Sequence, residues 1–327
     1  MILAVDGGNS KTDVALIDAE GGLLAHARGP LSSPHHLGLD GCVDVLEQLV
    51  TEIGLDGRRA EVATVLLAGL DFPEEEAELH AALDGRGWAE TTNVGNDTFA
   101  VLRAGTERGW GVAITCGAGI NCVGVAPDGR QVRFPALGPT TGDWGGGYDV
   151  GEAGLSAAAR SADRRGPDTE LERLVPAHFG LASPLEVAHQ IHRGLIETRR
   201  LVDLAPVVLG AASSDAVAAS IRDRLVDEIL ALVRATVTRL ALTSDQVEIV
   251  VGGGLMRAAD DELLGRIEAG LRGVGPRLVL RRTTLPPIVG AALLGLDATG
   301  AGPEAQLRVQ RELVAAVERV EQKAEAV

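Results

Sequence analysis

The first candidate site in the sequence is the run Asp6-Gly7-Gly8-Asn9-Ser10-Lys11-Thr12-Asp13. It follows the short apolar stretch Ile2 to Val5, which is typical of a buried strand. Two glycines directly after a strand allow a tight turn whose backbone comes close to a ligand. Consecutive N–H groups in such a turn form a concave anion site. Because Lys11 adds a positive charge and Thr12 adds a hydroxyl donor, the run predicts a phosphate site.

The same run also offers a metal ligand. Asp6 lies where a strand-end carboxylate can hold Mg²⁺, and water should bridge the two because Mg²⁺ gives up its hydration shell reluctantly. Thr12 to Asp18 is expected to be a second strand, so the predicted phosphate clamp is a β-hairpin rather than a loop-to-helix P-loop. An Asp-Gly-Gly hairpin turn with no ligand accounts for the same residues.

Three further turns follow predicted strands and carry glycine or acidic residues. They are Gly95-Asn96-Asp97, Cys116-Gly117-Ala118-Gly119 and Gly252-Gly253-Gly254. Taken alone, Asp97 is explained as a helix N-cap, and the last turn is explained as a simple strand-to-helix connection.

Composition limits the class of protein. The chain has 327 residues and a formal net charge of −16, with 46% hydrophobic and 2% aromatic residues. This length predicts two domains. The acidic balance argues against nucleic acid and anionic membranes as partners, because both require a basic surface.

The cysteines Cys42, Cys116 and Cys122 show no CxxC spacing and form no Cys/His cluster of the kind that binds zinc. With no room for a targeting segment before the first strand, they predict a reducing cytoplasm. No apolar run reaches the length of a membrane span.

The order of predicted elements indicates a duplicated α/β architecture. Each half opens with a three-stranded antiparallel meander whose first turn is rich in glycine, and helices dominate after residue 149. We predict an N-terminal domain over residues 1–107, a C-terminal domain with helical insertions over 108–297 and a helical tail over 298–327. The tail is expected to pack through Leu307, Leu313, Val314, Val317 and Val320.

These motifs, together with LGPTTGDWGGGYDVGEAG at residues 137–154 and VVGGG at 250–254, give the chain a specific resemblance. It resembles the actin-like, sugar-kinase and heat-shock ATPase superfamily, and within it the BadF/BadG/BcrA/BcrD ATPase family, specifically the N-acetylglucosamine kinase branch. The resemblance covers about residues 1–297. It implies two actin-like (ribonuclease H-like) domains with a cleft between them.

The resemblance also implies roles for individual residues. Asp97 matches the catalytic aspartate, which accepts a proton from the attacking sugar hydroxyl, in line with what phosphoryl transfer requires. Phosphate and ATP contacts are implied for Gly7, Gly8, Asn9, Lys11, Thr12, Gly117, Ala118, Gly119, Gly252, Gly253 and Gly254. Sugar contacts are implied for Asp97, Asn121, Gly138, Pro139, Thr140 and Asp143. Gly290 and Ala291 should pack closely against Ala100 and Ala104.

Some positions depart from the family pattern. Relatives carry Thr or Ser hydroxyls in the second phosphate turn, where this chain has Ala118 and Ile120, so backbone N–H groups should bind phosphate there. Pro34 stands where relatives use an asparagine to hold the sugar. Beside it are His35 and His36, one of which binds substrate unless both are loop histidines with no role. Asn121 and Asp143 are also explained by turn chemistry alone.

The sequence therefore predicts an ATP- and Mg²⁺-dependent kinase that phosphorylates a hydroxyl, at C6, of an amino sugar such as N-acetylglucosamine or glucosamine. We expect the enzyme to be cytoplasmic and, by resemblance to the family, to form a homodimer. The alternatives are an ATPase activator with a bridging [4Fe–4S] cluster, for which no cysteine pattern is present, and a nucleotide-switched protein with no sugar substrate.

Overall fold

The computed structural model describes residues 1–55, 57–243 and 245–325. Contacts divide the chain into two compact units. Unit 1 is formed by Met1–Ala113, Val123–Pro135 and the chain from Thr283 onwards, and unit 2 by Ile114–Cys122 and Ala136–Arg282. This division assigns the C-terminal helices to unit 1, whereas the boundaries predicted from the sequence set residues 298–327 apart as a tail.

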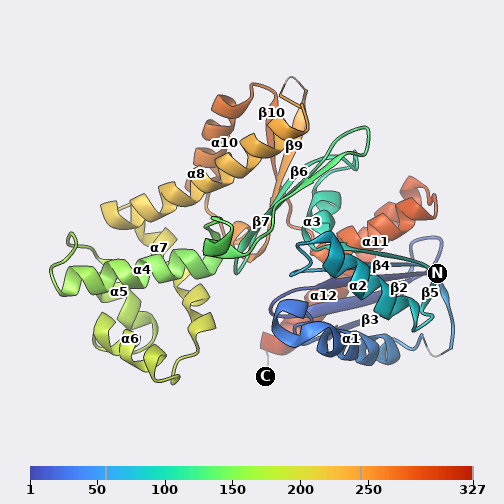
Figure 1. Cartoon of the computed structure of the whole chain (residues 1–327), viewed down its shortest axis with the longest axis horizontal. Coiled ribbons are helices and arrows are strands. Elements are labelled where there is room, and N and C mark those ends of the chain that lie inside the picture. Colours follow the sequence, from blue (N-terminus) through green and yellow to red (C-terminus); the bar gives the residue numbers. More distant parts are fainter. Residues whose placement is uncertain (56, 244, 326–327) are drawn as a thin grey trace. The chain divides into compact units, whose positions relative to one another are not determined.

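The first sheet positions the N-terminal motifs. Its strand order is β3-β2-β1-β4-β5, with β1 antiparallel to β2 and parallel to β4, and β4 parallel to β5. The strands are β1 (Ile2–Gly7), β2 (Thr12–Ile17), β3 (Leu23–Gly29), β4 (Ala60–Leu67) and β5 (Ala89–Asn96) (Figure 1). Gly7 of β1 pairs with Leu67 of β4, and Leu67 pairs with Asn96 of β5. The carboxyl ends of these three parallel strands therefore lie side by side at one edge of the sheet.

Alternate side chains of β1 are buried in two different hydrophobic clusters, one on each face of the sheet. Leu3 and Val5 are buried in a cluster with residues of α1 (Pro34–Glu52) and α2 (Pro73–Asp84). Ile2 and Ala4 belong to a second cluster with residues of α3 (Thr98–Gly105), α11 (Pro287–Ala298) and α12 (Pro303–Glu325). Successive side chains of a strand point to opposite faces, so helices cover both faces of this sheet.

The second sheet repeats the order of the first. Its order β10-β9-β6-β7-β8 matches β5-β4-β1-β2-β3 position by position. The strands are β6 (Gly111–Cys116), β7 (Ile120–Val125), β8 (Gln131–Arg133), β9 (Val247–Gly252) and β10 (Leu278–Arg282). The predicted α/β class and duplicated architecture are confirmed.

Helices make up most of unit 2. They are the 3₁₀ segments η1 (Gly138–Thr140) and η2 (Thr198–Leu204) and the helices α4 (Gly146–Ala162), α5 (Leu171–His178), α6 (Pro184–His192), α7 (Ala205–Ala211), α8 (Ala216–Arg239), α9 (Gly254–Arg257) and α10 (Asp261–Val274). No single helix of the described chain is long and apolar enough to cross a membrane, although Thr198–Ala211 and Ala216–Arg239, bent by 110°, pass that test as a pair.

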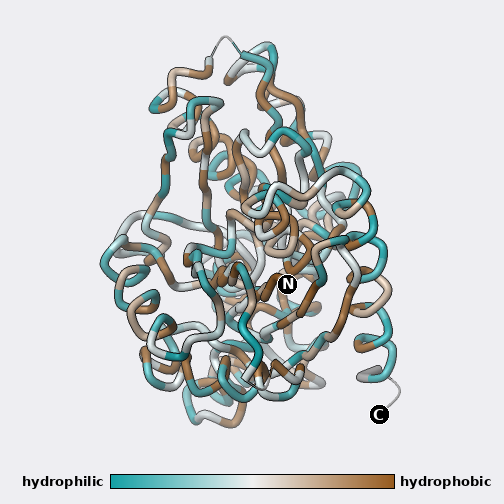
Figure 2. Tube along the Cα trace, turned by 90° about the vertical axis from the view of Figure 1, so that its right-hand side faces the viewer, coloured by the Kyte–Doolittle hydropathy of each residue, from teal (hydrophilic) through white to brown (hydrophobic). Residues whose placement is uncertain are grey.

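Helices α1 and α12 each show a local feature. The first turn of α1 is set off by Gly38, whose φ of 69° is the left-handed conformation that glycine adopts readily. In α12, hydrophilic and hydrophobic residues alternate along the turns (Figure 2), and Val309, Leu313 and Val317 are buried. Leu307, predicted to pack, is 60% exposed because it lies off this buried face.

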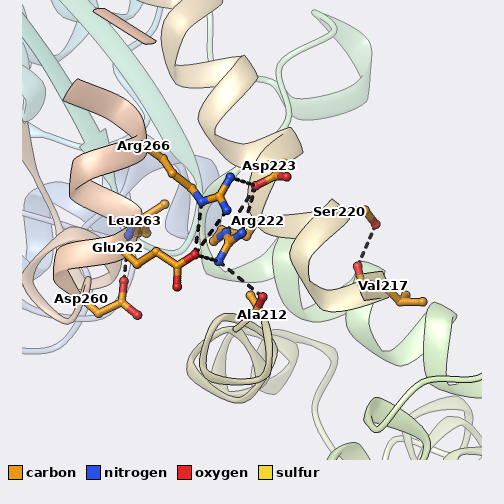
Figure 3. A network of polar contacts seen from close by, with 9 residues as sticks. All are labelled: Ala212, Val217, Ser220, Arg222, Asp223, Asp260, Glu262, Leu263 and Arg266. Atoms are coloured by element: carbon orange, nitrogen blue, oxygen red, sulfur yellow. Dashed lines mark hydrogen bonds and ion pairs between the residues drawn. The ribbon is translucent and has the colours of Figure 1, made fainter. Parts of the chain in front are cut away.

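A buried arginine links three helices of unit 2 (Figure 3). Arg222 of α8 is 4% exposed, and its guanidinium is 2.7 Å from Glu262 of α10 and donates to the carbonyl of Ala212 at 3.4 Å. Arg266 reaches Glu262 and Asp223 from the surface side at 3.3 and 3.1 Å.

We expect Arg222→Ala to lower the free energy of unfolding by about 1–3 kcal/mol, because Glu262 and the Ala212 carbonyl lose a buried donor. Arg266→Ala is the matched control, and it should change stability by about 0.5 kcal/mol or less, since its ion pairs are exposed. Urea denaturation measures both. Equal effects of the two substitutions would contradict this account.

Candidate active site

Three carboxylates follow the carboxyl ends of neighbouring parallel strands in unit 1. Asp6 is at the end of β1, Asp71 follows β4, and Asp97 directly follows β5. The Asp97 N–H donates to the carbonyl of Leu67 at 3.2 Å, which holds the turn after β5 against β4. In open α/β sheets this edge is where ligands bind.

Asn96 performs the capping role that the sequence offered to Asp97. Its Oδ1 accepts the N–H of Thr98 at 3.0 Å at the start of α3. Its Nδ2 donates to the carbonyl of Leu70 at 3.2 Å and to Asp71 Oδ1 at 3.4 Å. Asp97 does stand at the N-cap position of α3, as its place before the helix predicted, but its side chain makes no capping hydrogen bond there. The buried Asn96 amide satisfies the helix terminus instead.

The surroundings of Asp97 favour its protonated form. Burial raises the pKa of Asp97 to about 7, the charge of Asp71 adds to the rise, and contacts with Thr98 oppose it. Desolvation and a like charge both disfavour a carboxylate. Near neutral pH this group both accepts and releases a proton, which is what a general base requires.

The hairpin between β1 and β2 leaves backbone donors unused. The Gly8 N–H donates to the Lys11 carbonyl at 2.9 Å and closes the turn. Between them, the exposed Asn9 and Ser10 have N–H groups that make no hydrogen bond within the described chain. A Cβ at Gly7 would lie 2.3 Å from Leu67 Cδ2 and from Ser32 Oγ, so packing excludes a side chain there. The turn fits an anion held by backbone N–H groups.

The side chains of Thr12 and Lys11 are placed differently from the prediction. Thr12 is fully buried, and its hydroxyl donates to the Pro30 carbonyl at 2.7 Å, so its proton is not available to a phosphate. The Thr12 hydroxyl therefore stabilises the hairpin, and the prediction that it donates to phosphate is wrong. Lys11 Nζ is 3.2 Å from Glu321 Oε1, with the two side chains 39% and 51% exposed. Exposed ion pairs are weak, so a phosphate can displace this one.

The second glycine turn is built into the start of α4. Gly117 N–H donates to the Gly119 carbonyl at 3.0 Å. The first N–H groups of α4 then donate to this turn, Gly147 to Gly117 at 2.7 Å and Tyr148 to Ala118 at 2.9 Å. The N–H groups of Ala118 and Gly119 have no hydrogen-bond acceptor in the part of the chain that the structure describes, which leaves the turn with the backbone donors expected of it.

Glycines let three backbone segments of unit 2 meet. Gly253, with φ of 91°, would place a Cβ 2.5 Å from the Cys116 carbonyl oxygen. Gly146, with φ of 78°, would place one 2.4 Å from the backbone of Gly119. The structure therefore brings the Gly252–Gly254 turn, the Gly117–Gly119 turn and the start of α4 together.

The predicted sugar-binding residues of unit 2 organise their own loop. Asp143 Oδ2 accepts the N–H of Gly138 at 2.8 Å, and its Oδ1 accepts the Thr141 hydroxyl, so this carboxylate closes the loop that contains Pro139 and Thr140. Asn121 Oδ1 accepts the N–H of Cys122 at 2.7 Å. A carboxylate has about four lone-pair positions, so Asp143 retains acceptor capacity for a ligand.

The sequence reasoning missed Asp71 and Asp149. Asp71 follows a predicted parallel strand, and the shared edge of β1, β4 and β5 was the signal for it. Asp149 Oδ2 accepts the N–H of Gly145 at 2.7 Å. Burial raises the pKa of Asp149, and the charge of Asp143 raises it further. The hydrogen bond from Gly145 and the charge of Arg224 act in the opposite direction.

A cavity of about 900 Å³ lies between α4 and α8 and includes Asp149 and Glu152 in its wall. The Arg224 guanidinium stacks on the Trp144 ring there, 4.0 Å from the ring centroid. Trp144 directly follows Asp143, so the cavity begins beside the loop predicted to bind sugar.

The cysteines and acidic residues give little support to a bound metal cluster. Cys42, Cys116 and Cys122 are buried and free, and burial raises the pKa of each thiol to about 12. Among the described residues, no group of three or more His, Cys, Asp or Glu side chains is arranged to hold a metal ion.

Comparison with known proteins defines the class. The model of the BadF/BadG/BcrA/BcrD ATPase family matches residues 3–295, so the chain belongs to this family. The N-acetylmuramic acid/N-acetylglucosamine kinase of Clostridium acetobutylicum is 28% identical over 261 residues, covering 78% of this chain and 85% of the relative. The N-acetyl-D-glucosamine kinase of Dictyostelium discoideum is 24% identical over 319 residues, covering 91% of this chain and 98% of the relative.

A solved structure confirms the fold. The crystal structure of a proposed N-acetylglucosamine kinase from Chromobacterium violaceum matches with a TM-score of 0.69 and 23% identity, over 90% of this chain and 98% of that one. The actin-like fold that the motifs predicted is thereby established.

Proposed function

We propose that the protein transfers the γ-phosphoryl group of ATP to a hydroxyl, at C6, of an amino sugar such as N-acetylglucosamine or glucosamine. The observation that carries this proposal is Asp97. Its carboxylate stands at the ligand-binding edge of the first sheet, is relieved of helix capping by Asn96 and has a pKa of about 7. The names of the two relatives support an amino sugar as the acceptor.

In the proposed reaction, Asp97 accepts the proton of the sugar hydroxyl as that oxygen forms its bond to the γ-phosphorus and the bond to the β-phosphate oxygen breaks. The unpaired N–H groups of Asn9 and Ser10 in unit 1, and of Ala118 and Gly119 in unit 2, are the proposed phosphate donors. Positioning and charge neutralisation account for most of the rate in phosphoryl transfer.

A single carboxylate, Asp6, is the proposed protein contact of Mg²⁺. This fits an ion that keeps several waters and binds mainly through the phosphates. Bound there, Mg²⁺ would neutralise charge on the β- and γ-phosphates. The sugar contacts remain proposed for Asn121, Gly138, Pro139, Thr140 and Asp143, and the adenosine contacts for Gly252–Gly254. A homodimer and a cytoplasmic location stay predictions.

The proposal is tested by ADP release with Mg²⁺-ATP across glucosamine, N-acetylglucosamine, N-acetylmuramic acid, N-acetylmannosamine and glucose. We expect one or two amino sugars to raise ADP release at least about tenfold over the sugar-free rate, because domain closure on substrate favours transfer over hydrolysis. ADP release that no sugar changes would contradict the kinase and favour an ATPase activator or a nucleotide switch.

The pH dependence of kcat/KM follows from the raised pKa of Asp97. Only the ionised carboxylate accepts a proton, so kcat/KM should rise through a midpoint near the pKa of about 7 and level off above pH 8. A midpoint near 4, the range of an ordinary aspartate, would contradict the burial of the base. Initial rates in overlapping buffers at constant ionic strength measure the profile.

A further inference from the structure

A second carboxylate, Asp71, is held beside the proposed base. Its side chain is 3% exposed. Asn96 Nδ2 lies 3.4 Å from Asp71 Oδ1, and the same amide caps α3 immediately after Asp97. One buried side chain therefore fixes the turn that carries Asp71 relative to the turn that carries Asp97.

The charged groups around this pair come from several elements of unit 1. From α1, His35 Nε2 is 3.6 Å from Asp71 Oδ2. From α2, Glu75 Oε2 accepts the backbone N–H of Asp71 at 2.7 Å and of Phe72 at 3.0 Å. Glu76 of α2 pairs with Arg133 of β8 at 2.8 Å, and Arg133 also donates to the Leu70 carbonyl at 2.8 Å.

This arrangement assigns different tasks to Asp71, which lies in the turn after β4, and to Glu75 and Glu76 in the first turn of α2. Glu75 is used as a helix cap and Glu76 is neutralised by an arginine. Asp71 is the acid that Asn96 links to the base, and His35 is the side chain whose ring nitrogen faces it. A fixed negative charge at short range in a buried setting makes a neighbouring carboxylate a stronger base.

We propose that Asp71 is a positioning residue that sets the proton affinity of Asp97, with Asn96 holding the turn that carries Asp71 against the turn that carries Asp97. The proposal rests on the proposed function only in naming Asp97 as the base. Asp71 need not touch the sugar, and its charge acts through Asp97.

The test measures the protonation of Asp97 directly. Protein labelled with ¹³C at aspartate carboxyls is titrated by NMR, and the Asp97 signal is assigned by its loss in Asp97→Asn. Asp71→Asn removes the charge but keeps a side chain that Asn96 can contact. We expect the Asp97 midpoint to fall by about one pH unit, a tenfold loss of proton affinity.

Glu75→Gln is the matched control. It removes a negative charge from the first turn of α2 and keeps an oxygen that accepts the two N–H groups, so the Asp97 midpoint should move by less than about 0.3 unit. His35→Arg places a permanent positive charge against Asp71 and should lower the midpoint in the same direction as Asp71→Asn. This variant supplies the test should Asp71→Asn not fold, as judged by its thermal melt.

The pH profile of kcat/KM supplies the second measurement and should shift with the NMR midpoint. An unmoved Asp97 midpoint in Asp71→Asn and His35→Arg would overturn the proposal, as would an equal shift in Glu75→Gln. An increased KM for sugar with no shift in midpoint would make Asp71 a substrate ligand instead, and would also overturn it. The NMR titration needs no kinase activity, so a failure of the proposed function can be told apart from a failure of this proposal.

Discussion

Asp97→Asn is expected to lower kcat about 10³-fold, within the range that a positioned general base contributes, while the protein stays folded. Asparagine has nearly the shape of aspartate but accepts no proton at neutral pH. Because the Asn96 amide rather than Asp97 caps α3, the substitution leaves the helix start intact. KM for ATP should change little, since Asp97 acts on the sugar hydroxyl. Initial rates at pH 8, where the wild-type base is ionised, measure the loss.

The same variant should be more stable than the wild type above neutral pH. The folded pKa of about 7 exceeds the ordinary value of 3.8, so the unfolded chain ionises first as the pH rises. The wild type therefore loses stability between about pH 4 and pH 7, and above pH 7 the whole penalty is present. We expect Asp97→Asn to gain about 1–3 kcal/mol at pH 8, allowing for the part of the side chain that meets water, and little at pH 4.

Asp84→Asn is the control for both measurements. Asp84 ends α2, its side chain is 59% exposed, and it pairs with His80 one turn earlier. Its replacement should leave kcat unchanged and alter stability by about 0.5 kcal/mol or less. Activity within about threefold of wild type in Asp97→Asn would show that another group accepts the proton.

Gly290→Ala is expected to lower the free energy of unfolding by about 3 kcal/mol, the upper part of the range for overpacking. A Cβ at this position would lie 1.9 Å from the carbonyl oxygen of Ala100 and 2.6 Å from its carbonyl carbon. These are backbone atoms of α3, so no side chain can rotate away. To accept the methyl group, α11 must move from α3, the helix that begins directly after Asp97.

Gly265→Ala separates this packing effect from the helix propensity of glycine. Gly265 is inside α10, and a Cβ there would meet nothing within 4 Å. Alanine should stabilise that helix by about 0.5–1 kcal/mol, so the two substitutions have opposite signs. Chemical denaturation measures both, and a neutral Gly290→Ala would show that α3 and α11 are not in close contact in solution.

The sequence predicted the elements and turns well because their signals are local. Strands such as β4 are mostly apolar, and Pro73 and Pro287 mark the starts of α2 and α11. The close packing of Gly290 against Ala100 was also predicted, as an implication of the family resemblance, and a Cβ at Gly290 would indeed lie 1.9 Å from the Ala100 carbonyl oxygen. The three-stranded antiparallel meander that opens each half was predicted from its glycine-rich first turn, whereas the joining of each meander to two further strands in a five-stranded sheet was not predicted.

What the sequence did not predict depends on partners distant in the chain. The burial of the Thr12 hydroxyl is caused by the Pro30 carbonyl and Ser32, and the position of the Lys11 side chain by Glu321 at the far end of the sequence. The capping role of Asn96 and the proximity of Asp71 depend on the register of β4 and β5. The order of the strands indicates which turns meet at one edge, but the side chains that bond there are determined only by the folded chain.

The central claim, transfer of phosphate to a sugar rather than to water, is tested most directly by ³¹P NMR of the reaction products. Purified protein, Mg²⁺-ATP and the sugar that gives the highest ADP release are incubated together, and every phosphorus signal is integrated. We predict one sugar phosphate monoester for each ADP formed, with inorganic phosphate a minor product. Inorganic phosphate equal to ADP, with no sugar phosphate, would contradict the account.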